Sequence, residues 1–154
     1  MILKNYEINK INISHNNILL FYGQNQGAKQ EEIKKLISEN KNLSLFTYDE
    51  KDVIDKVNEF YENILSESLF ENEKIIIINR ATDKMLKIIE ELINRNITNL
   101  KIIINSDNLD KKSKLRSFFE KNKKLICVAF YPDNLITLSK IIQNFIRQKN
   151  ISIS

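Results

Sequence analysis

A glycine-bordered loop followed by a lysine is the segment whose residue types suggest phosphate chemistry. It runs Gly23-Gln24-Asn25-Gln26-Gly27-Ala28-Lys29-Gln30. A working phosphate-binding loop has the pattern G-x-x-x-x-G-K-[ST]. Its backbone amides cradle the phosphates, its lysine reaches the terminal phosphates, and its hydroxyl holds magnesium. Lys29 stands at the lysine position of this pattern, so the loop is a candidate nucleotide site.

Two of the three chemical requirements of such a loop are missing. Ala28 replaces the second glycine and tolerates a positive φ poorly. Gln30 replaces the magnesium-holding hydroxyl. The later strand that should end in an acidic residue to orient the metal ends in Asn79-Arg80 instead. We therefore expect a degenerate loop that carries no ATP hydrolysis, binds no cofactor and holds no metal.

Two other interpretations of the loop stay open. In one, Gly23 and Gly27 merely turn the chain, and Lys29 lies on the surface of a helix. In the other, the chain is a small P-loop ATPase or kinase that uses Lys29. Tight, magnesium-dependent binding of ATP in calorimetry would favour the enzyme.

Other catalytic arrangements have even less support in the sequence. His15 is the only histidine and Cys127 the only cysteine, so we expect no catalytic triad, no zinc cluster and no Cys-His pair. Cys127 lies in an apolar run, so we expect a buried thiol in a reducing compartment. Asp107 and Asp110 follow a predicted strand, but helix capping explains Asp110 equally well. We expect no intrinsic catalysis.

The net charge of +4 raises the possibility of a nucleic-acid partner. Most of the 24 basic residues are lysines, whereas specific phosphate and base recognition often depends on arginine. The densest basic segment contains Lys111, Lys112, Lys114 and Arg116, which could contact DNA or an acidic partner. A solvated helix face is the simpler interpretation. A DNA-binding module would show affinity for primed or single-stranded DNA that falls steeply with salt.

The elements that must position these residues alternate between strands and helices. Apolar runs predict five strands, at 18–22, 43–48, 74–79, 100–105 and 125–130. Four consecutive isoleucines in the third run indicate burial on both faces, as in a parallel sheet. Helical patterns separate the strands, so the alternation predicts a doubly wound α/β fold with a five-stranded, mainly parallel sheet. The pattern leaves residues 1–17 unassigned.

Capping residues predict where several helices begin. Asp49 can cap a helix that ends near Ser68, and Thr82 caps the next one. Asp110 can cap a helix that starts at Lys111, while Pro132 and Asp133 open the last helix. That last helix carries an apolar stripe that we expect to be buried: Leu135, Leu138, Ile141, Ile142, Phe145 and Ile146.

The tripeptide Ser68-Leu69-Phe70 stands between the helical stretch of residues 50–66 and the isoleucine strand. Leu69 continues the apolar stripe of that helix. Phe70 does not, because a step of about 100° per residue carries it off the stripe, and its neighbours are polar. A large aromatic in such surroundings is typical of a protein-binding anchor. The alternative is that both residues close the top of the core.

Length and composition are typical of one globular domain. The chain has 154 residues, of which 42% are hydrophobic and 29% charged. Its longest apolar runs are too short to cross a bilayer, and its N-terminus lacks the features of a signal peptide, so we expect a cytoplasmic protein with no membrane partner. The segment Ile151-Ser-Ile153-Ser154 begins a new alternating pattern.

Taken together, these features resemble the N-terminal domain of the delta subunit of the bacterial DNA polymerase III clamp loader. The resemblance rests on several features in order: Tyr22-Gly23 before a defective loop, Ser68-Leu69-Phe70 before the isoleucine strand, Ile102-Ile103-Ile104 leading into residues 108–114, and Phe130-Tyr131-Pro132 before the last helix. Their order and spacing extend over nearly the whole chain.

The resemblance implies a replication protein without catalysis of its own. Family members look like AAA+ ATPases that have lost ATP chemistry, with a P-loop NTPase-like (AAA+/RecA-like) three-layer fold. They bind the sliding clamp, the beta subunit, and open its ring, with Ser68, Leu69 and Phe70 as the carried-over contacts. The resemblance also implies other clamp-loader subunits as partners in the full-length protein, and primed DNA indirectly through the complex. Such a subunit belongs to a DNA-directed DNA polymerase (nucleotidyltransferase) holoenzyme.

The resemblance also implies a division of the chain. Residues 1–134 would be the AAA+-like clamp-binding domain without a functional nucleotide site. Residues 135–154 would be the final helix and the start of a truncated second helical domain. The rest of that helical domain and the collar domain that joins the other loader subunits would then lie outside this sequence.

Overall fold

The computed structural model describes residues 2–10, 17–39, 43–66, 73–95 and 99–149. Its strands are β1 (Ile2–Lys4), β2 (Ile18–Tyr22), β3 (Leu43–Asp49), β4 (Glu73–Asn79), β5 (Leu100–Asn105) and β6 (Ile126–Ala129). Its α-helices are α1 (Gln26–Glu39), α2 (Glu50–Asp55), α3 (Val57–Leu65), α4 (Leu86–Asn94), α5 (Lys114–Lys121) and α6 (Leu135–Gln148). Two 3-10 helices, η1 (Asn5–Lys10) and η3 (Asp83–Met85), complete these elements.

The strands form one parallel sheet in the order β1-β6-β2-β5-β4-β3. The five predicted strands are confirmed to within one residue at each end. The predicted count of five is wrong, because β1 adds a sixth strand beside β6, where Ile2 pairs with Cys127. β1 has only three residues, of which Leu3 alone is buried, so its sequence contains too little alternation to predict a strand.

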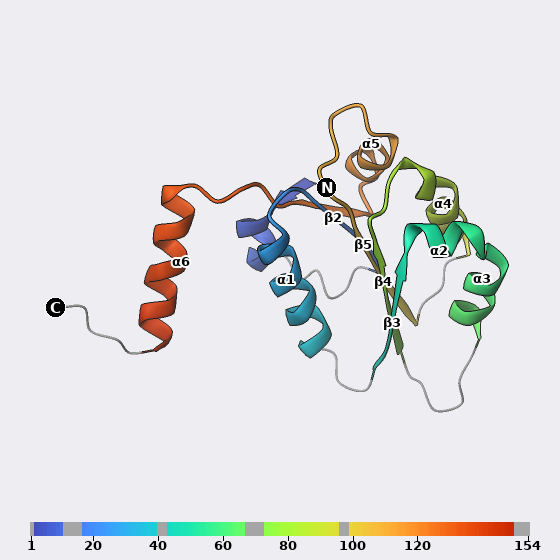
Figure 1. The fold of residues 1–154 in the computed structure, drawn as a ribbon, viewed down its shortest axis with the longest axis horizontal. Helices are drawn as coiled ribbons and strands as arrows, with labels where there is room; N and C mark the ends of the chain where they lie inside the picture. Colours follow the sequence, from blue (N-terminus) through green and yellow to red (C-terminus); the bar gives the residue numbers. More distant parts are fainter. Residues whose placement is uncertain (1, 11–16, 40–42, 67–72, 96–98, 150–154) are drawn as a thin grey trace.

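Helices cover both faces of the sheet and enclose two apolar cores (Figure 1). Helix α1 packs Ile33 and Leu36 on one face, together with Ile8 of η1. The other face packs side chains from α2 to α5, among them Phe60 and Phe119. Because the central strands are covered on both sides, their isoleucines are almost fully buried, as the sequence predicted. The arrangement is an α/β fold of three layers.

The single helix predicted over residues 50–66 is divided into two. Lys56 has φ −130° and ψ 47°, which interrupts the helix between α2 and α3. Val53, Phe60 and Ile64 are buried as the stripe predicts, but Ile54 and Leu65 are exposed. Asp49 stands at the N-cap position of α2, but its carboxylate accepts no capping hydrogen bond from the helix amides. The interruption divides the stripe between α2 and α3, yet Val53, Phe60 and Ile64 all pack in the same core.

Helices α5 and α6 also differ from their predictions. Helix α5 begins at Lys114 with Ser113 as its cap, whereas Asp110 accepts a hydrogen bond from the Lys112 amide in the preceding turn. Helix α6 begins after Asn134, whose side chain and Thr137 form a reciprocal capping box. No residue of α6 is buried, and Figure 1 shows the helix standing away from the sheet. Its predicted burial is therefore wrong for the described part of the chain.

A membrane-spanning segment is not found among the described helices, since none combines the required length with sufficient apolar character.

Candidate functional site

The loop after β2 turns at the carboxyl edge of the sheet, where ligands bind in many parallel α/β folds. Gly23 has φ +125°, a conformation that side chains disfavour. A Cβ atom at this position would lie 2.2 Å from the backbone oxygen of Phe130. Gly23 is therefore required by its φ and by the close approach of β6. A Cβ atom at Gly27 would make only an ordinary contact with Asn25 Oδ1, at 3.9 Å, so the fold does not require its glycine.

Backbone amides of this loop are engaged within the protein. The Gly23 amide donates to the Asp107 carbonyl oxygen (3.1 Å), and the Asn25 amide donates to the Phe130 carbonyl oxygen (3.2 Å). The Ala28 amide donates to Asn25 Oδ1 (3.1 Å). In a working phosphate-binding loop, amides at these positions point at the ligand. Here they tie the loop to β5, β6 and itself.

Lys29 is fully buried, which corrects the interpretation that placed it on a helix surface. Its Nζ donates a hydrogen bond of 2.6 Å to the carbonyl oxygen of Ser106, just after β5. Burial lowers the pKa of Lys29, and the nearby carboxylate of Asp107 opposes that shift. The ammonium therefore joins α1 to the end of β5, and would have to leave this contact to reach a phosphate.

Two side-chain hydrogen bonds also hold the loop after β2 against neighbouring segments of the protein. Gln26 Nε2 donates to Asp107 Oδ1 at 2.7 Å. Asn25 Nδ2 donates to Asp133 Oδ2 at 3.0 Å, in the segment that leads to α6. Together with Lys29, these bonds connect the start of α1 to the chain after both β5 and β6. Gly23, Gly27 and Lys29 are thus brought together, in a loop whose polar groups bind other parts of the protein.

The end of β4 has an arginine where an acidic, metal-orienting residue would stand. Arg80 adopts φ +57°, and its Nη2 forms an ion pair with Asp49 Oδ2 at the end of β3. Asn79 Oδ1 accepts a hydrogen bond of 2.9 Å from Asn105 Nδ2 on β5. A cationic side chain here would repel a divalent metal. Within the described residues, no group of three or more potential His, Cys, Asp or Glu ligands occurs.

The thiol of Cys127 on β6 is buried, as predicted. Burial raises its pKa to about 12, so the thiol stays protonated and unreactive at neutral pH. His15 lies outside the described residues.

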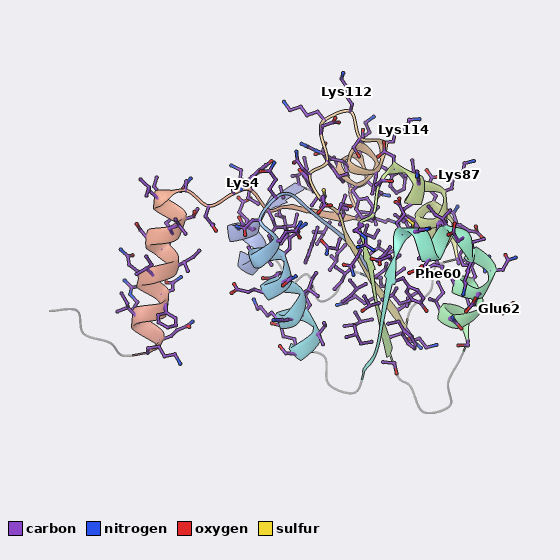
Figure 2. The ribbon with its side chains drawn as sticks, in the orientation of Figure 1. Lys4, Phe60, Glu62, Lys87, Lys112 and Lys114 are labelled. Carbon is purple, nitrogen blue, oxygen red and sulfur yellow. The ribbon has the colours of Figure 1, made fainter. Side chains whose placement is uncertain are left out.

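The predicted basic contact separates into exposed and engaged residues. Lys111, Lys112 and Lys114 are exposed in and just after the loop before α5, and Figure 2 shows Lys112 and Lys114 extending from this end of the molecule. Arg116 is different, because only 16% of its side chain is exposed. Its Nε contacts Glu120 Oε1 at 2.7 Å, and its Nη1 donates to the Leu109 carbonyl oxygen at 3.0 Å.

Arg116 therefore holds the loop before α5 in place and stacks over the ring of Tyr22, with 5.0 Å between Cζ and the ring centroid. These contacts make its guanidinium a poor candidate for binding DNA or an acidic partner. The three lysines keep that predicted role, since their exposure leaves them accessible to a partner.

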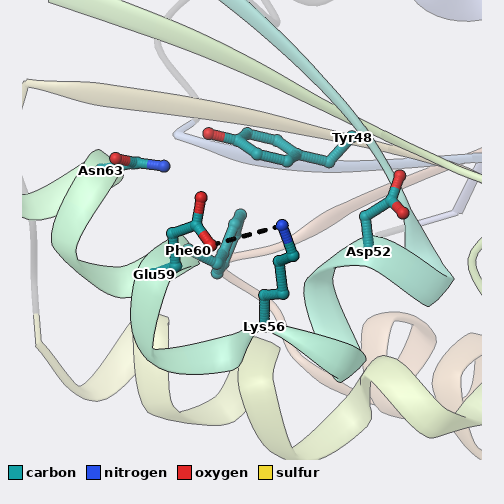
Figure 3. A pocket seen from close by; sticks show the side chains of 6 residues that line it. All are labelled: Tyr48, Asp52, Lys56, Glu59, Phe60 and Asn63. Carbon is teal, nitrogen blue, oxygen red and sulfur yellow. Dashed lines mark ion pairs between the residues drawn. The ribbon is translucent and has the colours of Figure 1, made fainter.

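A small pocket of about 150 Å³ lies on the α2–α3 side of the domain. Figure 3 shows the ring of Tyr48 across from Phe60, and the ion pair between Lys56 and Glu59, whose charged atoms are 3.6 Å apart. Strands β5 and β4 separate the pocket from the loop after β2. The pocket is lined by Tyr48, Asp52, Lys56, Glu59, Phe60 and Asn63. Its volume is well below the roughly 300–1,000 Å³ of ordinary ligand sites, so it has no room for a nucleotide.

A family model described as DNA polymerase III, delta subunit, matches residues 19–129, from β2 to the end of β6. The chain belongs to this family. The matched segment contains the loop at Gly23, the tripeptide at Ser68 and the lysines before α5. No curated protein sequence matches the chain.

Among solved structures, the DNA clamp loader delta protein (YqeN) of Bacillus subtilis matches with a TM-score of 0.68 at 13% sequence identity. The match covers 97% of this chain and 49% of that protein, so the chain spans about half the length of this delta protein. At this identity the likeness demonstrates a shared fold. The structure of Drosophila ORC bound to DNA has a TM-score of 0.45 at 13% identity, covering 93% of this chain and 45% of that one. That likeness is too weak to support an inference.

For this member of the delta subunit family, the predicted clamp contacts Ser68, Leu69 and Phe70 lie outside the described residues. The nearest described residues are Ser66 before them and Glu73 after them. Helix α3 ends at Leu65 with Ser66 as its C-cap, and β4 begins at Glu73. Lys74 contacts the end of α3, a link that the sequence analysis did not predict. The sequence signal for this contact is a lysine directly before four consecutive isoleucines.

Proposed function

We propose that the chain is part of a clamp-loader delta subunit that binds the sliding clamp and opens its ring during DNA replication, without hydrolysing ATP itself. The observation that carries this proposal is the match of residues 19–129 to the delta subunit family. Ser68, Leu69 and Phe70 are the proposed clamp contacts. A replication role of this kind implies a cytoplasmic protein, with the clamp and the other clamp-loader subunits as partners and primed DNA reached through the complex.

The proposed ring opening follows from a difference in binding. A subunit that binds the open edge of the clamp more tightly than the closed interface shifts that equilibrium by its difference in affinity and no further. Anchor side chains buried in a partner's pocket contribute about 2 kcal/mol or more each, and about 1.4 kcal/mol corresponds to a tenfold change in affinity. Leu69 and Phe70 together could therefore dominate the affinity for the clamp.

The loop after β2, whose polar groups bind other parts of the protein, supports the proposal that this chain does not hydrolyse ATP. Lys29 binds the Ser106 carbonyl oxygen, and Arg80 stands where a metal-orienting acid is needed. The alternative enzyme that uses Lys29 would have to break a buried hydrogen bond before binding phosphate. In the proposed holoenzyme, a DNA-directed DNA polymerase, partner subunits supply the ATP chemistry. The helix that follows the loop after β2 supports an AAA+-like origin of the domain.

We assign residues 1–134 to the clamp-binding domain and residues 135–154 to the start of a second helical domain. Helix α6 supports this boundary, because Leu135, Ile141 and Phe145 are all more than half exposed. Such a helix is stable only when its apolar face is covered. Continuation into further helices would provide that cover.

Exposed lysines support a secondary contact with DNA in the same complex. Lys111, Lys112 and Lys114 would bind phosphates as point charges rather than read sequence. The contribution of such contacts falls steeply as salt increases.

The proposal is tested by measuring binding to the cognate clamp with Leu69→Ala and Phe70→Ala combined. We expect affinity to fall by at least a hundredfold, while the thermal midpoint remains nearly unchanged, because the two anchors act in the partner's pocket. The matched control is Leu135→Ala with Ile136→Ala, which also removes two exposed apolar side chains and should leave binding intact. A large loss of stability with clamp affinity retained would assign Leu69 and Phe70 to the core and contradict the proposal.

A further inference from the structure

Lys74 is a buried lysine at the head of the isoleucine strand. Only 8% of the residue is exposed. Its side chain points to the face of the sheet that α3 covers, and its Nζ lies 5.9 Å from the centroid of the Phe46 ring. Burying an ammonium is costly unless oxygen atoms replace its water. The surroundings of Nζ therefore indicate what this lysine does.

Among the described residues, Nζ of Lys74 binds oxygens at the end of α3. It donates to the carbonyl oxygen of Ser66 at 2.5 Å and to that of Asn63 at 3.3 Å. Ser66 Oγ lies 3.2 Å away. The last carbonyls of a helix lack partners within the helix and carry its negative dipole end. A buried cation at this point satisfies these carbonyls and joins α3 to β4.

The contact also joins two points of the chain that border the proposed clamp contacts. Ser66 is the last described residue before segment 67–72, and Glu73 is the first after it. The backbone of Lys74 is itself fixed, since its amide donates to the Asn99 carbonyl oxygen at 3.0 Å and its strand pairs with β3 and β5. The ammonium consequently holds the entry and exit of segment 67–72 at a set separation.

We infer that Lys74 is a positioning residue for clamp binding, because its ammonium fixes the two ends of the segment that carries Ser68, Leu69 and Phe70. This inference rests on the proposed function. Fixing the ends of a binding segment lowers the conformational entropy that is lost on association. Removing the ammonium should weaken clamp binding although Lys74 itself does not touch the clamp.

The test compares clamp binding by the wild-type chain, Lys74→Met and Lys74→Arg. Methionine keeps the apolar stem and removes the ammonium, so we expect affinity to fall about tenfold, which corresponds to about 1.4 kcal/mol. Arginine keeps a cation that can donate to the same carbonyls and should restore affinity to within about threefold. Hydrogen exchange at the Ser66 amide, which donates to the Glu62 carbonyl oxygen in α3, should accelerate in Lys74→Met.

The matched control is Lys87→Met, which removes the same charge from the exposed face of α4 (Figure 2). Equal losses of affinity in Lys74→Met and Lys87→Met would indicate general electrostatics and overturn the inference, as would unchanged binding by folded Lys74→Met. If the methionine variant does not fold, Lys74→Gln is judged by the same criteria.

A second comparison separates positioning from stability. Lys74→Met is combined with Leu69→Ala, and its effect on affinity should shrink, because the two residues act through one segment. An undiminished effect would overturn the inference by showing that Lys74 acts elsewhere. Absence of clamp binding by the wild-type chain would instead refute the proposed function itself.

Discussion

Single residues in this chain have roles that depend on burial more than on type. Lys29 stands at the lysine position of a phosphate loop, but it is buried and binds the Ser106 carbonyl oxygen. Arg116 belongs to a basic cluster by sequence, but its guanidinium binds Glu120 and the Leu109 carbonyl oxygen. In both cases the sequence predicts a cation that could bind a ligand, whereas in the structure the cation binds an oxygen of the protein itself. Burial favours this outcome, because an unpaired charge inside a protein is costly.

Gly23 and Gly27 offer a matched test at the residue scale. Gly23→Ala should lower the free energy of unfolding by at least about 2 kcal/mol, since alanine at φ +125° is strained and its Cβ would meet the Phe130 carbonyl. Gly27→Ala should be neutral or stabilising by up to about 1 kcal/mol, because Gly27 lies in α1 and an added Cβ would make only an ordinary contact with Asn25 Oδ1, at 3.9 Å. Urea denaturation of both variants provides the measurement. Equal stability of the two would contradict the close approach of the loop to β6.

At the scale of elements, helix α5 is capped by residues that are far apart in sequence. Ser113 caps it locally, with its hydroxyl oxygen accepting from the Arg116 amide at 3.1 Å. Asp83, from η3, accepts from the amides of Lys114 (3.0 Å) and Leu115 (2.9 Å) and from the Ser113 hydroxyl (2.7 Å). These hydrogen bonds, led by that of the Leu115 amide, hold the pKa of Asp83 below its usual value. A local pattern predicts Asp110 as the cap, but only the folded chain brings Asp83 to this position.

Asp83→Ala should therefore lower the free energy of unfolding by about 1 kcal/mol at neutral pH. Because the native pKa is depressed, this stabilisation is present above the unfolded pKa of about 4 and is lost as pH falls through the native pKa. The difference between wild type and variant should accordingly shrink below about pH 4. Denaturant unfolding from pH 7 to pH 3 measures it. Asp55→Ala, an exposed acid at the end of α2, is the control and should change stability by less than about 0.5 kcal/mol. A pH-independent difference would show that the Asp83 carboxylate does not act as the cap.

At the scale of the whole molecule, helix α6 is separate from the three-layer domain. Its capping box closes its N-terminus, and its Leu135 is 83% exposed. The domain itself has two cores that are complete without α6. The exposure of α6 supports the proposed domain boundary near residue 134.

A chain ending at Asn134 should keep its thermal midpoint within about 3 °C of that of the full chain, because α6 buries no residue against the domain. It should also associate less at high concentration, since the exposed apolar side chains of α6 are removed. Differential scanning calorimetry and sedimentation measure the two quantities. A midpoint lower by 10 °C or more would show that α6 packs on the domain in solution.

The sequence alone determined the alternation of strands and helices, because the four consecutive isoleucines of β4 and the amphipathic pattern of α4 are local properties of the chain. It also predicted a degenerate phosphate-binding loop at Gly23, because Ala28 and Gln30 replace residues that the phosphate-loop pattern requires. Only the tertiary structure decided the sixth strand, the interruption at Lys56, and the partners of Lys29, Lys74 and Asp83. Those partners come from segments that are separated along the sequence and that meet only when the chain packs. No local pattern therefore encodes which oxygen a buried cation will bind.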